Sequence, residues 1–168
     1  MKIIFLDIDG VLATDKEFMR NKEKFWKKHP AMAELKVPYP WNEEAVKVFN
    51  EILDETGAEI VLTSDWRLHW NLDELKGIFT WNGVKKHPIG VTEEDQLISN
   101  LEMSRAGEIE SYIKSVDVKC YVVIDDLNIG KYMSFTKDDD KFFMTRSGQG
   151  IKQTGLKEKI IKKLNHDY

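Results

Sequence analysis

The stretch MKIIFLDIDGVL, residues 1–12, begins with a strongly apolar run and turns acidic at Asp7 and Asp9, just before Gly10. An unbroken apolar run is typical of a strand that is buried on both faces, as in a parallel sheet. The two aspartates therefore lie at the carboxyl end of a strand, where open parallel sheets bind ligands. Carboxylates this close repel each other unless a cation or a shared proton lies between them. Taken alone, the segment also fits a turn in which Asp and Gly supply ordinary turn chemistry.

Two later segments repeat the pattern of an apolar strand that ends in polar side chains. Residues 58–62 (AEIVL) lead into Thr63-Ser64-Asp65, and residues 120–124 (CYVVI) lead into Asp125-Asp126. Helical patterns separate these strands. Alternating strands and helices predict an α/β fold built from βαβ units around a mostly parallel sheet.

The expected helices are bounded by residues that favour helix ends. Asn42 and Gly57 are the predicted N-cap and C-cap of one helix. Ser104 is a predicted N-cap that places Arg105 in the first turn of its helix, and Thr154 is a predicted cap of the last helix. Further helical patterns cover 16–28 and 68–82, and short strands are expected at 85–91, interrupted by Pro88, and at 142–145.

The length and composition fit one globular domain. The chain has 168 residues, of which 42% are hydrophobic and 32% charged, so we expect a single domain over 1–168 with a small insertion at about 14–41. Cys120 is the only cysteine, which excludes an intrachain disulfide and a zinc site built from several cysteines. No apolar stretch approaches the roughly 20 residues of a membrane span, and the apolar start is too short for a signal peptide, so we expect a cytoplasmic protein with no membrane partner. The net charge of −4 gives no general reason to expect nucleic-acid binding, although a local basic patch remains open.

The strand ends together predict a site for a metal and a phosphate. Parallel strands place their carboxyl ends at one edge of the sheet, where three or four carboxylates need a cation, and oxygen ligands suit Mg²⁺. A hydroxyl and the guanidinium of Arg105 next to such a metal suit a phosphate. A carboxylate can itself attack phosphorus and form an aspartyl-phosphate.

These motifs resemble those of the haloacid dehalogenase (HAD) superfamily of phosphotransferases. The sequence from Asp7 to Leu12 resembles its first motif, Thr63-Ser64 its second, Arg105 its basic third and Asp125-Asp126 its fourth. The finer pattern, Ser-Asp-Trp-Arg at 64–67 and Arg-x-x-Glu-Ile from residue 105, is similar to the small HAD domains associated with RNA-repair proteins and phages. The resemblance implies a Rossmann-like, HAD-like three-layer αβα domain with only a small cap insertion.

The resemblance also implies a role for each motif. Asp7 would be the nucleophile, and Asp9 the general acid and then the general base. Asp125 would bind Mg²⁺ together with Asp7 and the backbone carbonyl of Asp9, with Asp126 supporting the metal shell. The expected phosphate-binding residues are Thr63, Ser64, Gly10 and Arg105, with Thr63 favoured over Ser64, and Lys114 as a fallback for Arg105. By resemblance, the second aspartate, Asp9, favours phosphate chemistry over dehalogenation.

The substrate and two rival functions stay open. We expect a Mg²⁺-dependent phosphomonoesterase acting on a phosphorylated small molecule, such as a nucleotide, or on a nucleic-acid end. Trp66 and Arg67 directly follow the phosphate-binding motif and are candidate substrate contacts, although Arg67 also suits an ion pair with a carboxylate such as Asp65. The main alternative is a non-catalytic phosphate- or nucleic-acid-binding module on the same fold. A receiver-type signalling domain is disfavoured, because the acidic pair comes at the last of the three long strands. The sequence does not indicate an oligomeric state.

Overall fold

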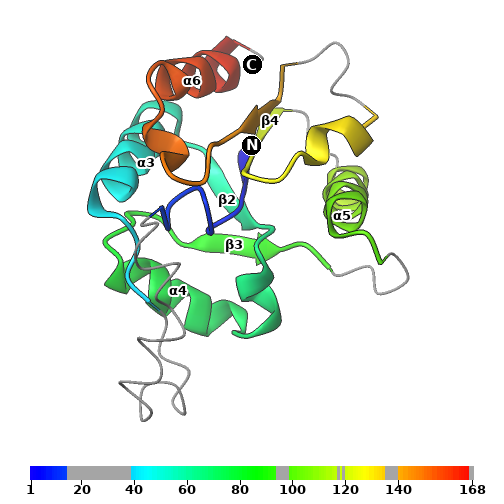
Figure 1. Ribbon diagram of the computed structural model, residues 1–168, viewed down its shortest axis with the longest axis horizontal. Helices are drawn as coiled ribbons and strands as arrows, with labels where there is room; N and C mark the ends of the chain where they lie inside the picture. Colours follow the sequence, from blue (N-terminus) through cyan, green and yellow to red (C-terminus); the bar gives the residue numbers. More distant parts are fainter. Residues whose placement is uncertain (15–38, 94–98, 117, 119, 135–139, 167–168) are drawn as a thin grey trace.

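Five parallel strands form one sheet in the order β3-β2-β1-β4-β5 in the computed structural model (Figure 1). The structure describes residues 1–14, 39–93, 99–116, 118, 120–134 and 140–166. The strands are β1 (Lys2–Leu6), β2 (Glu59–Leu62), β3 (Pro88–Val91), β4 (Cys120–Asp125) and β5 (Phe142–Met144). The predicted α/β fold with a parallel sheet is confirmed. Pro88 begins the edge strand β3, a position where a missing backbone N–H is tolerated.

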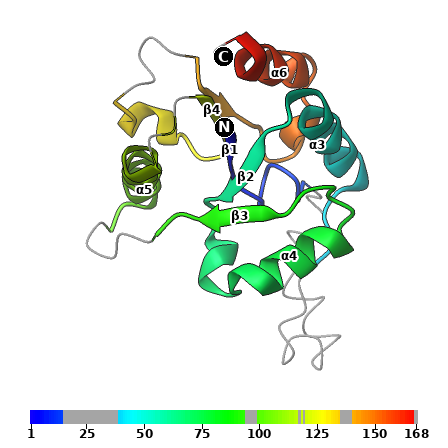
Figure 2. The ribbon, with the colours of Figure 1, turned by 180° about the vertical axis from the view of Figure 1, so that it is seen from behind.

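Alternate side chains of β1 pack into two different layers, which explains the unbroken apolar run in the sequence. Ile4 and Leu6 belong to the core that contains α3 (Glu43–Thr56), α4 (Leu72–Trp81) and α6 (Leu156–His166). Ile3 and Phe5 belong to the opposite core, against α5 (Leu101–Val116). Figures 1 and 2 show α3 and α6 on one side of the sheet and α5 on the other. The result is the expected three-layer αβα arrangement.

The helix ends agree with the sequence in one case and differ from it in two. Asn42 caps α3 by accepting a hydrogen bond from the backbone N–H of Ala45, and Gly57 ends the helix with a φ of 67°. The prediction for α5 was wrong, because the helix begins at Leu101 and Asn100 accepts the N–H of Met103 at 2.9 Å. Ser104 thus lies inside the helix and Arg105 in its second turn. Similarly, α6 begins at Leu156, so Thr154 lies one residue before the cap position.

Short 3₁₀ helices complete the described elements, and part of the sequence prediction lies outside them. The predicted helical stretch 68–82 is divided into η1 (Asp65–Leu68) and α4, while η2 (Ile129–Tyr132) and η3 (Gly150–Lys152) follow β4 and β5. The helix predicted over 16–28, and most of the insertion predicted over 14–41, fall outside the described residues. Within the residues that the structure describes, no helix is both long and apolar enough to cross a membrane.

Backbone hydrogen bonds continue past the ends of the strands and align the polar residues that follow them. The N–H of Asp7 donates to the carbonyl of Ile124 at 3.0 Å, and the N–H of Thr63 donates to the carbonyl of Leu6 at 2.9 Å. On the other side, the N–H of Thr145 donates to the carbonyl of Asp125 at 2.9 Å. The polar ends of β1, β2 and β4 therefore lie at one edge of the sheet, as predicted, and the polar end of β5 lies beside them.

Candidate active site

Three aspartates from two neighbouring strand ends form an acidic cluster. Asp7 follows β1, Asp125 ends β4 and Asp126 comes next in the chain; one carboxylate oxygen of each lies within 4.8 Å of the others. Asp7 and Asp125 are buried, and Asp126 is half-buried. Burial raises the pKa of Asp7 well above its usual range, and the charge of Asp125 raises it further. Burial also raises the pKa of Asp125, although Arg105 opposes the shift.

The pKa of Asp126 is raised as well. Burial and the neighbouring charge of Asp125 raise the pKa of Asp126 to about 6. Each of these shifts reports that the ionised form is disfavoured where several carboxylates crowd together. A divalent cation reverses that preference, and a set of oxygen ligands is what Mg²⁺ selects. The cluster is thus suited to hold a metal ion.

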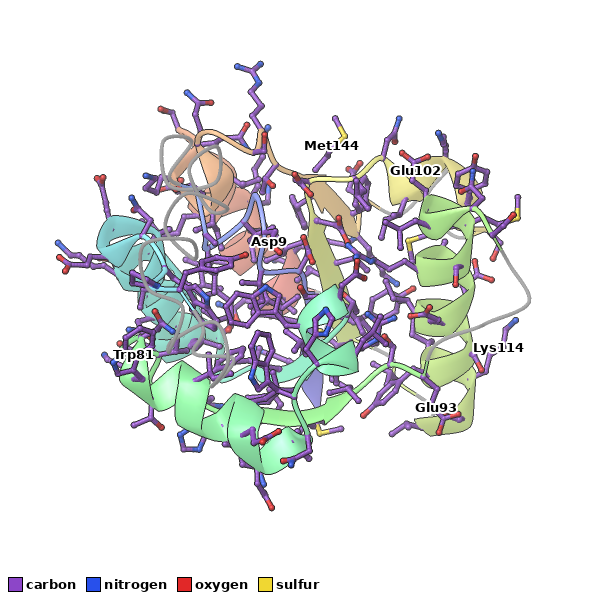
Figure 3. The ribbon with its side chains drawn as sticks, turned by 60° about the horizontal axis from the view of Figure 1, so that its bottom comes forward. Asp9, Trp81, Glu93, Glu102, Lys114 and Met144 are labelled. Carbon is purple, nitrogen blue, oxygen red and sulfur yellow. The ribbon has the colours of Figure 1, made fainter. Side chains whose placement is uncertain are left out.

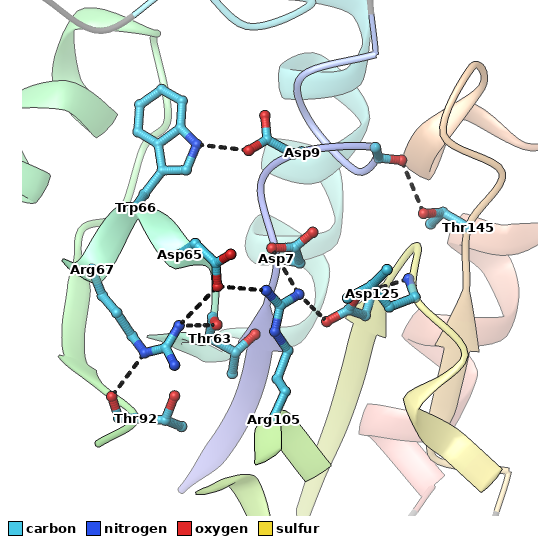
Figure 4. Close-up of polar contacts among 12 residues, drawn as sticks. Asp7, Asp9, Thr63, Asp65, Trp66, Arg67, Thr92, Arg105, Asp125 and Thr145 are labelled. Carbon is cyan, nitrogen blue, oxygen red and sulfur yellow. Dashed lines mark hydrogen bonds and ion pairs between the residues drawn. The ribbon is translucent and has the colours of Figure 1, made fainter. Parts of the chain in front are cut away.

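Arg105 is the buried cation of the site. Its Nη1 lies 2.9 Å from Asp125 Oδ2 and 3.3 Å from Asp7 Oδ1, and its Nη2 lies 2.9 Å from Asp65 Oδ1 (Figure 4). Burial lowers the pKa of Arg105, but the carboxylates of Asp7 and Asp125 together outweigh it and raise the pKa, so Arg105 is charged at every physiological pH. The predicted basic residue therefore contacts the predicted nucleophile. The fallback, Lys114, is exposed in the last turn of α5 and lies far from Asp9 in Figure 3.

Asp9 is held apart from the acidic cluster by two aromatic side chains. The hydroxyl of Tyr39 donates a hydrogen bond to Asp9 Oδ1, and the indole N–H of Trp66 donates to Oδ2 at 3.1 Å. The two rings also meet edge to face, with their centroids 4.9 Å apart. Asp9 was predicted to bind the metal through its backbone carbonyl, and this stays a prediction; its side chain is not part of the acidic cluster. Its carboxylate is oriented instead by donors from outside that cluster.

The two predicted hydroxyl residues come from the turn between β2 and η1. Thr63 is fully buried, and its Oγ1 has no hydrogen-bond partner among the described residues. Figure 4 shows Thr63 next to Asp7 and Arg105. A buried hydroxyl without a partner costs about 1–3 kcal/mol, which an anionic ligand at this position would recover. Ser64 is also buried, and its backbone carbonyl accepts the N–H of Arg67 at 3.0 Å.

Gly10 shapes the loop that follows Asp7 and Asp9. It has a φ of 79°, and a Cβ at this position would lie 2.2 Å from Asp126 Oδ2. Its N–H donates to the carbonyl of Ala13 at 3.0 Å, and its own carbonyl accepts the hydroxyl of Thr145 at 2.9 Å. Since the N–H already has a partner within the loop, the structure supports a steric role for Gly10 more than the predicted contact with phosphate.

Arg67 is engaged in a buried network rather than offered to a ligand. Its Nη1 donates to the carbonyl of Thr63 at 2.6 Å and its Nε to the carbonyl of Thr92 at 3.0 Å. Its Nη2 lies 2.6 Å from Glu108 Oε2. These contacts favour the ion-pair alternative for Arg67, with Glu108 as the close partner and Asp65 more distant at 3.7 Å. The guanidinium thereby fixes the turn that presents Thr63.

Several residues of the site carried little or no signal in the sequence. Tyr39 lies in a Pro-Tyr-Pro stretch whose pattern indicates only a loop. Asp65 was visible in the second motif, but its pairing with Arg105 depends on how α5 packs against the sheet. Thr145 could have been found, because it is a polar residue directly after a strand, like Asp7 and Thr63.

A family model described as "HAD domain in Swiss Army Knife RNA repair proteins" matches residues 3–156. This range contains β2 to β5, all of β1 except Lys2, and every site residue described above. No significant match was found among the curated proteins or among the solved structures.

Proposed function

We propose a specific phosphatase activity for this chain. The chain belongs to the family of HAD domains in Swiss Army Knife RNA repair proteins, and this family supports a phosphatase-like function. The protein is a Mg²⁺-dependent phosphomonoesterase that acts through an aspartyl-phosphate on Asp7. The observation that carries the proposal is the meeting of Asp7, Asp125, Asp126 and Arg105 at one edge of the sheet, with Asp9 oriented separately nearby.

The acidic cluster fits the metal that this chemistry needs. HAD domains usually use Mg²⁺, and the residues that would hold it are Asp7, Asp125 and Asp126. When bound, the ion supplies positive charge that neutralises the transferring phosphoryl group and the crowded carboxylates. The raised pKa values of the three aspartates support this assignment, since burial disfavours their ionised forms and a bound cation would favour them.

Asp7 is the nucleophile, and Arg105 stabilises the phosphoryl group that is transferred. The carboxylate of Asp7 attacks the phosphorus atom of a phosphate monoester, and the bond from phosphorus to the ester oxygen breaks. Arg105, which already lies 3.3 Å from Asp7, orients the nucleophile and offsets the charge of the phosphoryl oxygens. Thr63 donates its unpartnered hydroxyl to one of those oxygens. Water then attacks the aspartyl-phosphate and regenerates Asp7 with release of inorganic phosphate.

Asp9 moves the proton in both steps. Protonated Asp9 gives its proton to the departing ester oxygen, and the resulting carboxylate takes a proton from the attacking water. An indole N–H can only donate, so Trp66 keeps Asp9 Oδ2 as an acceptor throughout. A tyrosine hydroxyl can donate or accept, so the proton is carried on Oδ1, next to Tyr39.

The preferred substrate is a nucleotide or the terminal phosphate of a nucleic acid. The family is one of HAD domains in RNA repair proteins, which supports this choice over other phosphate monoesters. Phosphate release should be measured with and without Mg²⁺ from an aryl phosphate, 5′- and 3′-mononucleotides, oligonucleotides phosphorylated at either end and a phosphopeptide. Metal-dependent release that is fastest from an oligonucleotide end is the expected result. Folded, Mg²⁺-binding protein that releases phosphate from none of them would favour the non-catalytic binding module.

A further inference from the structure

A groove outside the catalytic cluster combines positive charge with apolar surface. It has a volume of about 620 Å³ and lies between β5 and α6. One wall is formed by the edge strand, through Phe142, Phe143 and the exposed Met144. The other wall is the face of α6 that Figure 1 shows beside the sheet. This groove differs in composition from the acidic catalytic site.

The helix wall carries a basic stripe. Lys159, Lys162, Lys163 and His166 line the groove and recur at the spacing of helical turns, which places them on one side of α6. Asp140 is the acidic residue among the lining side chains, so three lysines face one carboxylate. The residues that line the groove therefore carry a net positive charge.

Two of these lysines have no anionic partner within the described chain. Lys157, on another side of α6, pairs with Glu51 at 2.9 Å. By contrast, Lys159 and Lys162 are exposed and form no ion pair with any described residue. The helix pairs Lys157 with α3 and leaves Lys159 and Lys162, beside β5, without an ion pair among the described residues, so this surface suits an anion.

The groove is connected to the catalytic edge by the chain that follows β5. Thr145 comes directly after Met144, and its hydroxyl donates to the carbonyl of Gly10 in the loop that carries Asp9. Arg146 comes next and is exposed. A ligand lying in the groove at the end of β5 is thus adjacent in the fold to the loop that holds the proposed proton donor.

We propose that this groove binds the strand of a single-stranded nucleic acid whose terminal phosphate is the substrate. The lysines suit the phosphate backbone, and the apolar wall, with the partly exposed Phe143 ring on the α6 side of the sheet and the exposed Met144, suits unstacked bases. The regular spacing of the lysines favours a repeating polyanion over a single phosphate. The inference rests on the proposed phosphatase function for the identity of the terminal group, but the binding itself does not require turnover.

The test is binding of a fluorescent single-stranded RNA of about 12 nucleotides, measured by anisotropy with EDTA present so that no hydrolysis occurs. Lys159→Glu/Lys162→Glu should weaken binding at least tenfold. It should also lower the slope of log Kd against log salt by about 1.4, since each contact to a single strand contributes about 0.7. The matched control is Lys47→Glu/Lys76→Glu, which changes the net charge equally on α3 and α4 and should have little effect.

Activity separates this proposal from the phosphatase assignment. In the groove variant, KM for an oligonucleotide end should rise while kcat/KM for an aryl phosphate stays at the wild-type value. Equal loss of RNA binding in the groove and control variants would overturn the proposal that the groove binds RNA. So would wild-type protein that binds an acidic peptide of equal charge more tightly than RNA. Wild-type protein that binds RNA through the groove but hydrolyses no phosphate ester would overturn the proposed phosphatase while leaving the groove intact.

Discussion

At the scale of single residues, the orientation of Asp9 is the most specific feature of the site. Trp66 contacts the Asp9 carboxylate with its indole N–H, and Tyr39 contacts the other oxygen. These contacts come from the 3₁₀ helix η1 and from a loop that are distant from each other in sequence. They decide where the proton of Asp9 can sit and therefore how well it reaches the leaving oxygen.

Trp66→Phe should lower kcat/KM more for substrates whose leaving group must be protonated than for substrates whose leaving group departs without a proton. The variant keeps an aromatic ring against Tyr39 but removes the donor to Asp9 Oδ2. We expect kcat/KM to fall about tenfold or more for an alkyl phosphate and only slightly for a nitrophenyl phosphate, whose leaving group departs without protonation. Trp81→Phe, at an exposed position, is the control. An equal loss for both esters would assign Trp66 a purely structural role.

Gly10→Ala should damage both folding and metal binding. The added Cβ would lie 2.2 Å from Asp126 Oδ2, and the φ of 79° disfavours any side chain. We expect a loss of about 1–3 kcal/mol in the free energy of unfolding and weaker Mg²⁺ binding, measured by urea titration and calorimetry. Gly77→Ala is the matched control, because a Cβ there meets no atom within 4 Å and the residue lies in α4. That change should be neutral or stabilising by up to about 1 kcal/mol.

At the scale of the elements, α4 shows how local sequence sets a helix boundary. Asn71 accepts hydrogen bonds from the N–H groups of Asp73 and Glu74, and the Glu74 side chain returns a contact to the N–H of Asn71. Asn71→Ala should lower the free energy of unfolding by about 1 kcal/mol without changing kcat, as measured by urea unfolding and steady-state kinetics. Asn71→Asp keeps the acceptor and should retain most of the stability. An unchanged stability in the alanine variant would mean that tertiary packing alone fixes this boundary.

The elements also show how far the sequence predicts the structure. The apolar run of β1 and the caps of α3 are local signals, so the strand, the helix and the position of Asp7 could be read directly. The start of α5 could not, because Asn100 and Ser104 are both acceptable caps and the buried contact of Ser104 with Glu108 decides between them. The orientation of Asp9 likewise depends on Tyr39, which only the folded chain brings close.

At the scale of the whole molecule, the protein gathers negative charge in its interior, and its stability should depend on pH and metal together. Burial raises the pKa of Asp7 and Asp125, and raises that of Asp126 to about 6 from an ordinary value of 3.8. A carboxyl group with a raised pKa in the folded state contributes stability that is complete below the unfolded value. That stability is lost as the pH rises through the folded value.

Mg²⁺ should therefore stabilise the protein more at higher pH. We expect the increase in Tm on adding Mg²⁺ to grow between about pH 5 and about pH 7, as measured by thermal unfolding in EDTA and in excess Mg²⁺. Asp126→Asn should reduce this dependence on pH. A stabilisation that is the same throughout the range would contradict a metal site formed by these carboxylates.

The most direct test of the account is the turnover of Asp7→Asn in the presence of Mg²⁺, with an aryl phosphate and a phosphorylated oligonucleotide as substrates. The amide keeps the shape of the side chain and relieves crowding among the carboxylates, so the variant should fold. Its phosphate release should fall at least about 1,000-fold, because the nucleophile is lost. Asp54→Asn, at an exposed ion pair with Lys85, should retain wild-type activity. Near-wild-type turnover by Asp7→Asn would contradict the aspartyl-phosphate mechanism.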